Sequence, residues 1–250
     1  MMSIAARASR YLSRYTDRRL MPLRGNSGVV SFSFDDAPLS ACIAGAAALE
    51  AHGVRGTFYV AGGLTDGVEE GLRCHSEGAL RTLLGNGHQL GAHSFSHVHV
   101  DRLNSAGRRQ EFDRSASFLR GLGVDMAALD FAYPFGGVNL GAKHDCARRY
   151  RSSRATGGGT HVGEADLNAL RTHRLYRSQP DGVSYIERLA IAANQRGWLV
   201  VNTHEVQDDA GPFGCTPAEL RTAVRQALAS GCQVMTVGAA IEYWTAQAAP

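Results

Sequence analysis

Residues 29–38 read VVSFSFDDAP, an apolar, β-rich run that leads directly into two adjacent carboxylates and a proline. The run Val29–Phe34 predicts a strand, and Pro38 suits the first turn of a following helix, where its missing N–H is not needed. Neighbouring side chains at a strand end point in different directions, so Asp35 and Asp36 can face a metal ion and a substrate separately. The simpler interpretation, in which one of them only caps the next helix, stays equally open from these residues alone.

Outward from this stretch, short β-rich runs alternate with helical stretches along the chain. The predicted strands are 29–34, 57–60, 89–93, 129–133, 198–203 and 233–237. The predicted helices are 40–52, 79–86, 105–122, 184–195 and 217–230. A glycine follows closely on each of these helices, where a left-handed residue commonly ends a helix.

This βαβα order predicts a parallel sheet with crossover helices. The fold class is therefore α/β. Six or more such units in about 220 residues favour a distorted (β/α) barrel of about seven parallel strands with surrounding helices. An open doubly wound sheet is the alternative. No internal repeat, low-complexity tract or linker interrupts the pattern, so we expect residues 25–250 to form one domain.

Composition narrows the function classes. The chain has 250 residues, of which 44% are hydrophobic, so it can bury a large core and is not expected to be disordered. Its formal net charge of +3 gives no ground for a nucleic-acid partner. The five cysteines are odd in number and form no CxxC pair. Reduced, mostly buried thiols are therefore expected rather than disulfides or a thiolate zinc site.

The N-terminal segment, residues 1–24, predicts a separate basic amphipathic helix over residues 3–20. Its apolar face comprises Ile4, Ala8, Tyr11, Leu12 and Tyr15, and the flanking arginines are Arg7, Arg10, Arg14 and Arg18. Packing on the domain or on a partner is the simpler interpretation, and peripheral contact with an anionic membrane is the alternative. Because arginines interrupt any signal-like apolar run, the predicted location is cytoplasmic, with membrane-peripheral contact as a variant.

A histidine pair follows the predicted strand at 89–93, in the stretch His93–His97, HSFSH. Histidines at i and i+4 lie one helical turn apart, and both imidazoles can then reach one divalent ion. With Asp36 they form a 2-His-1-carboxylate set that leaves positions for water and substrate. Non-haem iron oxygenases use such a set too, but usually as His-x-Asp plus a distant histidine on a β-helix, which this chain does not resemble.

A third candidate residue is the histidine that ends the stretch WLVVNTH at residues 198–204. A nearly continuous apolar run is typical of a buried parallel strand. His204 at its end is a candidate general acid, and a hydrogen-bonded structural histidine is the equally open alternative.

Together these stretches resemble the polysaccharide deacetylase family of the NodB-homology, carbohydrate esterase type, which includes chitin, chitooligosaccharide and peptidoglycan deacetylases. SFDDAP resembles the family's Thr/Ser-Phe-Asp-Asp-Gly motif, and HSFSH its His-Ser/Thr-x-x-His motif. Phe131–Gly136, FAYPFG, resembles the third motif, Leu199–His204 the final Leu-x-x-x-x-His region, and Gly56–Val60 the second strand. The resemblance covers roughly residues 28–240.

The resemblance implies a metal-dependent hydrolase that removes an N-acetyl group from an amino sugar in a saccharide, a glycan precursor or a glycolipid. Asp36, His93 and His97 would hold a divalent metal, most often zinc. Asp35 would be the general base that activates water.

The resemblance also assigns roles on the other side of the substrate. His204 would protonate the leaving amine, and the backbone N–H of Phe135 would help to hold the oxyanion. Leu199 would line the pocket for the acetyl methyl group.

Three features depart from the family pattern, of which Ala37 in place of the usual glycine is the smallest. The third motif usually begins with an arginine that holds the base, and Ala132 stands there instead. Either another cation, Arg171 or Arg174, is expected to replace it, or Asp35 is less well oriented. The Asp/Trp-containing motif that supports the catalytic histidine is not recognisable, and Asp166 is the expected partner of His204.

Two further functions stay open at this stage. A related hydrolase could cleave another non-peptide C–N bond, such as a formamide or a cyclic ureide. A non-catalytic sugar-binding relative is the alternative from another class, and Ala132 in place of the motif arginine motivates it.

Overall fold

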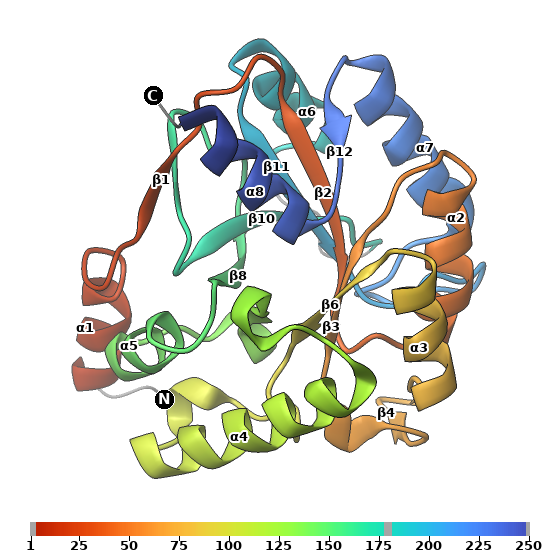
Figure 1. The fold of residues 1–250 in the computed structure, drawn as a ribbon. Helices are drawn as coiled ribbons and strands as arrows, with labels where there is room; N and C mark the ends of the chain where they lie inside the picture. Colours follow the sequence, from red (N-terminus) through yellow and green to blue (C-terminus); the bar gives the residue numbers. More distant parts are fainter. Residues whose placement is uncertain (1–3, 178–181, 249–250) are drawn as a thin grey trace.

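The barrel is a closed ring of seven parallel strands in the computed structural model, which describes residues 4–177 and 182–248 (Figure 1). Its strands are β2 (Val29–Phe34), β3 (Thr57–Val60), β6 (Gln89–Ala92), β7 (Asp130–Ala132), β8 (Ser152–Gly158), β10 (Leu170–Arg174) and β11 (Trp198–Thr203). Pairing of β11 with β2 over their six residues closes the ring. The predicted distorted (β/α) barrel of about seven parallel strands is confirmed.

An eighth parallel strand, β12 (Gln233–Val234), shares one edge of β2 with β3. The first two residues of β2, Val29 and Val30, pair with β12, whereas Ser33 and Phe34 pair with β3. The edge of β2 is therefore divided between two neighbours, which distorts the barrel.

Helices surround the ring (Figure 1). They are α2 (Ala46–Glu50), α3 (Glu77–Gly85), α4 (Ser105–Leu122), α5 (Leu140–Ala147), α6 (Tyr185–Asn194), α7 (Pro217–Ala229) and α8 (Val237–Ala248). A π-helical turn, Ala41–Gly45, leads into α2, and 3₁₀ turns occupy Gly62–Leu64, Val100–Arg102, Met126–Ala128 and Pro134–Gly136. Capping boxes begin α6 at Ser184 and α7 at Thr216, and left-handed Gly123 ends α4.

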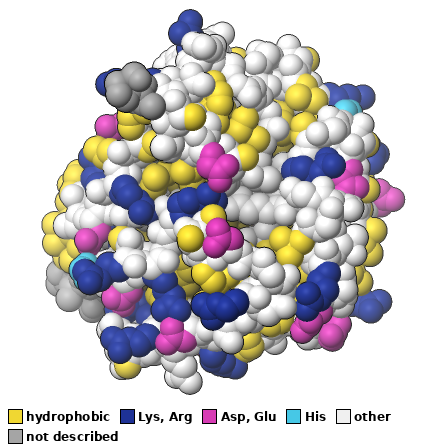
Figure 2. Space-filling view, viewed as in Figure 1, with side chains coloured by type: hydrophobic (Ala, Val, Ile, Leu, Met, Phe, Trp, Pro, Cys, Tyr) yellow, Lys and Arg dark blue, Asp and Glu magenta, His cyan; other side chains and the backbone are white. Residues whose placement is uncertain are grey.

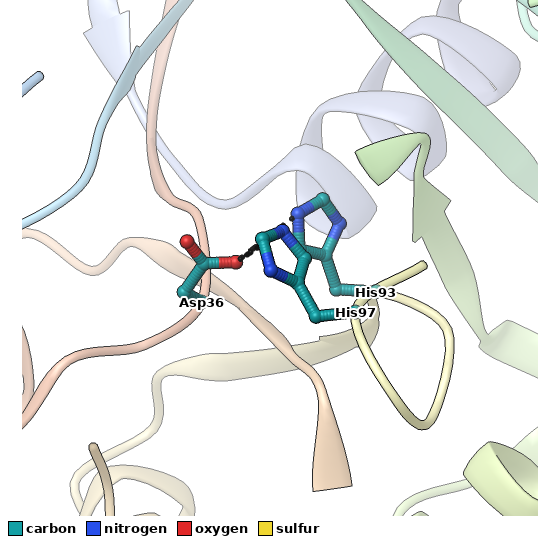
Figure 3. A group of neighbouring side chains, drawn as sticks. All are labelled: Asp36, His93 and His97. Carbon is teal, nitrogen blue, oxygen red and sulfur yellow. Dashed lines mark ion pairs between the residues drawn. The ribbon is translucent and has the colours of Figure 1, made fainter. Parts of the chain in front are cut away.

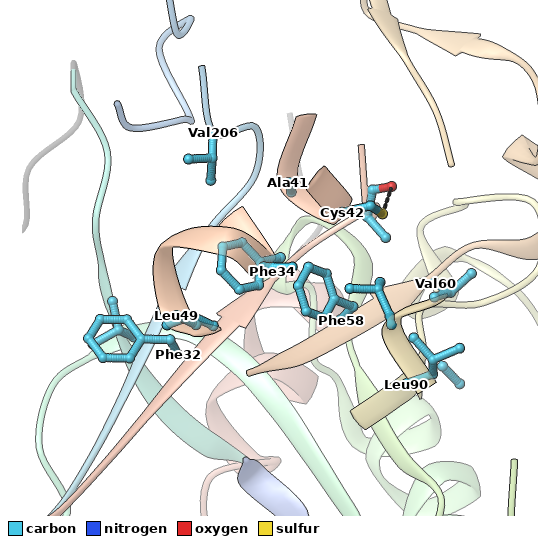
Figure 4. Packing of buried hydrophobic residues seen from close by; sticks show 14 of the residues in the cluster. Phe32, Phe34, Ala41, Cys42, Leu49, Phe58, Val60, Leu90 and Val206 are labelled. Carbon is cyan, nitrogen blue, oxygen red and sulfur yellow. Dashed lines mark hydrogen bonds between the residues drawn. The ribbon is translucent and has the colours of Figure 1, made fainter. Parts of the chain in front are cut away.

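Side chains of β2 alternate between two environments. Val30, Phe32 and Phe34 pack in the core between strands and helices, where Phe34 stacks on Phe58 with ring centroids 4.5 Å apart (Figure 4). The residues between them face the barrel interior, and Val29 belongs to a second cluster with Trp198. Continued past the strand end, the same alternation directs Asp35 into the barrel.

Strands β8 and β10, with the sequences SSRATGG and LRTHR, carry no apolar alternation and were not predicted. The same holds for α5, for the antiparallel pair β1 (Leu20–Pro22) and β9 (Glu164–Asp166), and for the hairpin β4 (Val68–Glu69) and β5 (Leu72–Arg73). Burial and strand pairing, rather than intrinsic propensity, hold these segments in place.

The N-terminal helix is shorter than predicted, because α1 ends at Leu12. It lies beside α5, where the backbone N–H of Leu140 donates to Ser9 Oγ and Lys143 Nζ donates to the carbonyl of Ser13. Tyr11, Leu12 and Tyr15 stay exposed.

Across the described residues, no helix has the length and apolar character needed to cross a membrane. Basic and acidic side chains are interspersed over the face shown in Figure 2.

Candidate active site

Three side chains from two strand ends meet at the carboxyl edge of the barrel. Asp36 follows β2, and His93 and His97 follow β6. Asp36 Oδ1 lies 3.1 Å from His97 Nε2 and 3.4 Å from His93 Nε2. One ligand atom from each residue lies within 4.8 Å of the other two. Figure 3 shows the carboxylate directed at the two rings.

Both histidines direct Nε2 at Asp36. His93 Nδ1 donates to the carbonyl oxygen of Ala132 at 2.8 Å, and His97 Nδ1 donates to Glu69 Oε1 at 3.1 Å. Each ring therefore carries its proton on Nδ1. Burial is the main reason that the pKa of His93 falls to about 4, so this ring is neutral near pH 7.

These residues fit a divalent cation. Asp36 Oδ1 is buried and, among the described residues, has no hydrogen-bond partner. A carboxylate oxygen and two imidazole lone pairs facing one another repel unless a positive charge lies between them. Two imidazoles and one carboxylate are ligands that zinc and similar ions accept. Their role as metal ligands stays a prediction, which this geometry supports.

The expected helical turn at His93–His97 is wrong. The segment is a loop in which Ser94 and His97 adopt left-handed φ angles of 55° and 48°. Glu111 on α4 holds this loop by accepting hydrogen bonds from the backbone N–H groups of Phe95 and Ser96. Tertiary contacts to α4, rather than helical periodicity, bring the two rings together.

Asp35 is paired with an arginine that the sequence did not reveal. Arg154 Nη2 on β8 donates to Asp35 Oδ1, and both side chains are buried. The guanidinium also lies over the ring of Tyr59, 4.8 Å from its centroid. Burial raises the pKa of Asp35, but Arg154 and the neighbouring imidazoles outweigh it, and the net shift is downward. Asp35 is therefore held as a carboxylate.

The expected replacement of the missing arginine by Arg171 or Arg174 is thus wrong. Arg171 Nη2 donates to the carbonyl of Thr160, and the cation at Asp35 is Arg154. In the barrel register Arg154 pairs with Ala132, so the positive charge has moved to the neighbouring strand. In the sequence, Arg154 stands out only as an arginine next to small residues, and this signal is too weak to identify it as the partner of Asp35.

His204 follows β11 and faces the same group. Its Nε2 lies 3.8 Å from Asp36 Oδ2. Its Nδ1 is buried without a hydrogen-bond partner in the described part of the chain. The expected partner, Asp166, is engaged elsewhere, because it accepts from Lys143 Nζ at 2.7 Å. That expectation is therefore wrong.

Comparison with known proteins identifies the family. The sequence model described as "Polysaccharide deacetylase" matches residues 24–148, half of the chain. The chain belongs to the polysaccharide deacetylase family. No curated protein sequence matches it significantly.

Solved structures show the same fold in proteins of low sequence identity. The Xyl-CE4 domain of a multidomain xylanase from a Trinervitermes trinervoides hindgut metagenome has 19% identity and a TM-score of 0.57, covering 87% of this chain and 91% of that one. A family 4 acetyl xylan esterase from Clostridium thermocellum, in complex with a cobalt ion, has 18% identity and a TM-score of 0.56, covering 89% and 93%. The chitin deacetylase of the fungal pathogen Colletotrichum lindemuthianum has 17% identity and a TM-score of 0.58, covering 88% and 89%.

Phe135, in the third motif of this polysaccharide deacetylase, lies against the metal-ligand candidates. Its ring stacks on His97 and His99, with centroids 4.6 and 4.1 Å apart, although half of the side chain is exposed. Its left-handed φ of 58° makes a sharp turn after β7. The proposed use of its N–H as an oxyanion donor stays a prediction.

A pocket of about 200 Å³ opens between Asp36 and His204 and is walled by the β4–β5 hairpin and by Phe213. Glu69 and Glu205 also line it. Leu199 lies outside this pocket, because it faces the helices and is fully buried in the main core. The expectation that Leu199 lines the acetyl pocket is therefore wrong. Glu69 was also missed, since nothing in the sequence relates it to His97.

Proposed function

We propose that this polysaccharide deacetylase is a metal-dependent hydrolase that removes an N-acetyl group from an amino sugar in a saccharide, a glycan precursor or a glycolipid. The observation that carries the proposal is the buried Asp36 Oδ1, which faces two imidazole Nε2 atoms. Family membership supports an acetylated carbohydrate as the substrate.

Asp36, His93 and His97 would hold the ion, which we propose to be zinc. When bound, a divalent ion polarises an amide carbonyl and makes water more acidic. The cobalt ion in the Clostridium thermocellum esterase is consistent with a divalent metal in this fold. The Nδ1 bonds to Ala132 and Glu69 fix both rings, so the ligand geometry is set before an ion arrives.

Asp35 would act as the general base. Its charge is stabilised by Arg154, and it projects from the same strand end as Asp36, so it lies within one residue of the ligand set. Water attacking the amide carbon would give its proton to this carboxylate.

His204 would act as the general acid, since an amine leaves only with a proton. His204 follows β11 and lies beside Asp36, whereas Asp35 follows β2 and its partner Arg154 lies on β8. The proposed acid and the proposed base therefore come from different strands. The N–H of Phe135 would donate to the carbonyl oxygen as negative charge develops on it. A cytoplasmic location, with peripheral membrane contact through α1, is part of the same proposal.

Two alternatives are kept. A relative that cleaves a formamide or a cyclic ureide would use the same groups. A sugar-binding relative without turnover is favoured by one observation: His204 Nδ1 has no carboxylate partner among the described residues, so the acid is less firmly oriented.

The test is acetate release by the purified, zinc-loaded chain from chitin oligomers, N-acetylated peptidoglycan fragments and N-acetylhexosamines. We expect release by the wild type and loss of release in Asp35→Asn. Asp113→Asn, an exposed carboxylate on α4 outside the pocket, serves as the control. Formate release from formamides, or ring opening of a cyclic ureide to the ureido acid, separates the first alternative. Sugar binding without acetate release, with Asp35→Asn indistinguishable from wild type, would favour the second.

A further inference from the structure

A second cleft, larger than the pocket at Asp36, opens beside the candidate active site. It has a volume of about 830 Å³ and lies between the N-terminal segment, the carboxyl end of β8 and the amino-terminal part of β10. Four arginines line it: Arg10, Arg14 and Arg18 from the N-terminal segment and Arg171 from β10. We call this cavity the arginine cleft.

The arginine cleft adjoins the metal-ligand candidates. Gly136 lines it and directly follows Phe135, whose ring lies 4.6 Å from that of His97. Gly158, which also lines it, belongs to the strand that carries Arg154, four residues earlier. The turn after β7 and strand β8 therefore connect the arginine cleft with the candidate active site.

The charges in the arginine cleft do not cancel. Arg10 pairs with Asp101 at 2.6 Å and Arg18 with Glu164 at 3.1 Å. The cleft carboxylate of Asp166 is neutralised by the buried Lys143. Within residues 4–177 and 182–248, no carboxylate forms an ion pair with the two remaining cations, Arg14 and Arg171.

Arg171 is held in an environment that favours an anion. Partial burial and the nearby Arg188 both lower its pKa, so the cation is unfavourably placed as it stands. Beside it, Gly157, Gly158 and Gly159 all adopt left-handed φ angles, between 74° and 97°. A Cβ at Gly158 would lie 2.9 Å from the Arg171 side chain. The contact at Gly158 is with the aliphatic carbons of Arg171, so the missing Cβ lets this side chain lie directly against the β8 backbone at the wall of the cleft.

We propose that the arginine cleft binds the phosphate or diphosphate group of a phosphorylated N-acetylated sugar, whose acetamido group then lies at Asp36, His93 and His97. This inference rests on the proposed deacetylase function and names the class of its substrate. The planar guanidinium fork matches phosphate oxygens in pairs, which favours phosphate over a neutral sugar in this cleft.

The phosphate could be joined to a nucleoside or to a lipid. Tyr11 and Leu12 on α1, and Tyr15 in the turn after it, are exposed; the same segment supplies Arg10 and Arg14. This apolar surface next to the cleft would contact the hydrocarbon of a lipid-linked substrate and would be unused by a nucleotide.

The first experiment is calorimetric binding of inorganic diphosphate to the full chain at low salt. Arg14→Ala and Arg171→Ala are each expected to weaken binding roughly tenfold. The double variant Arg221→Ala/Arg225→Ala removes two exposed charges from α7, on the far side of the barrel, and is expected to leave the affinity unchanged. Because Arg171 also donates to the carbonyl of Thr160, Arg171→Lys tests whether the charge or the fold matters. Failure of diphosphate to bind, or equal weakening by the α7 variant, overturns the inference.

The second experiment compares acetate release from a neutral N-acetylhexosamine, a nucleoside-diphosphate N-acetylhexosamine and a polyprenyl-diphosphate N-acetylhexosamine in detergent micelles. We expect a higher kcat/KM for a phosphorylated substrate than for the neutral one. The double variant Arg14→Ala/Arg171→Ala should lose this difference, and its kcat/KM for the neutral substrate should equal that of the wild type. If the enzyme prefers the polyprenyl compound and Leu12→Ser removes this preference, the phosphate of the substrate is joined to a lipid. If the enzyme prefers the nucleotide compound, the phosphate is joined to a nucleoside.

These results separate the two proposals. Equal kcat/KM for neutral and phosphorylated sugars, unchanged in the arginine variants, refutes the phosphate site and leaves the deacetylase intact. Arginine-dependent diphosphate binding without acetate release from any sugar supports the anion site and refutes the deacetylase function.

Discussion

Arg154 donates a hydrogen bond to Asp35 inside the barrel, which joins β8 to the end of β2 through a buried ion pair. The two residues are 119 positions apart in the chain. Because Arg154 pairs with Ala132 across β7 and β8, its guanidinium comes from the strand next to the one where the family motif carries its arginine. The base therefore keeps a cationic partner although the motif position is an alanine.

Removal of this partner is expected to damage both stability and activity. Arg154→Met should lower the free energy of unfolding by about 3–5 kcal/mol, because it leaves the Asp35 charge buried and unpaired. Urea unfolding of the metal-loaded chain measures this change. Arg149→Ala breaks the exposed pair with Asp113 and is the control, with an expected loss of about 1 kcal/mol or less. Similar unfolding midpoints for both variants would contradict a buried ion pair.

Moving the arginine back to the motif position should restore part of the lost function. Ala132 and Arg154 are register partners on adjacent strands, about 5 Å apart. We expect Ala132→Arg/Arg154→Ala to release more acetate than Arg154→Ala alone. If the double variant folds, as judged by circular dichroism, and is no more active than the single one, then the cation must come from β8 specifically.

Glu69 is expected to tune metal affinity through His97. It accepts the Nδ1 proton of His97, and loss of such an outer carboxylate typically weakens metal binding by roughly 10–100-fold. Titration of the apo chain with zinc measures the affinity of Glu69→Gln. Glu70→Gln changes the next residue of the same hairpin and should bind zinc like wild type. Equal affinities for all three proteins would exclude this positioning role.

Replacement of His204 should affect turnover without affecting the ion. We expect His204→Gln to lower kcat by roughly 10²–10⁴-fold, the usual contribution of a general acid. Zinc affinity should change little, because the ligand candidates are Asp36, His93 and His97. A variant that loses zinc together with activity would instead make His204 part of the metal site.

His161 is expected to make the fold sensitive to acid. Burial lowers its pKa to about 3, whereas an unfolded histidine titrates near 6.5. Only the unfolded chain takes up this proton between these values, so the contribution is complete above pH 6.5 and is lost as the pH falls toward 3. Between pH 6.5 and 5 the loss should be about 1–2 kcal/mol. Urea unfolding at both pH values should show a smaller loss in His161→Gln, and identical losses would refute the assignment.

The sequence by itself determined the elements whose local pattern agrees with their final environment. The predicted bounds of β2, β3, β11 and α4 match the structure, because the strands are continuously buried and α4 ends at a left-handed glycine. The order of carboxylates and histidines at strand ends also required only local reading, since parallel strands bring their carboxyl ends to one edge.

Tertiary structure alone decided the supporting groups. Arg154, Glu69 and Arg171 lie on a polar strand, a short hairpin and another polar strand, none of which has a periodic signal. The loop at His93–His97 is shaped by Glu111, and the arginine cleft exists only because α1 lies beside the barrel. Local patterns encode burial and backbone preference, whereas the pairing of charges across a barrel depends on strand register, which distant segments fix only when the ring closes.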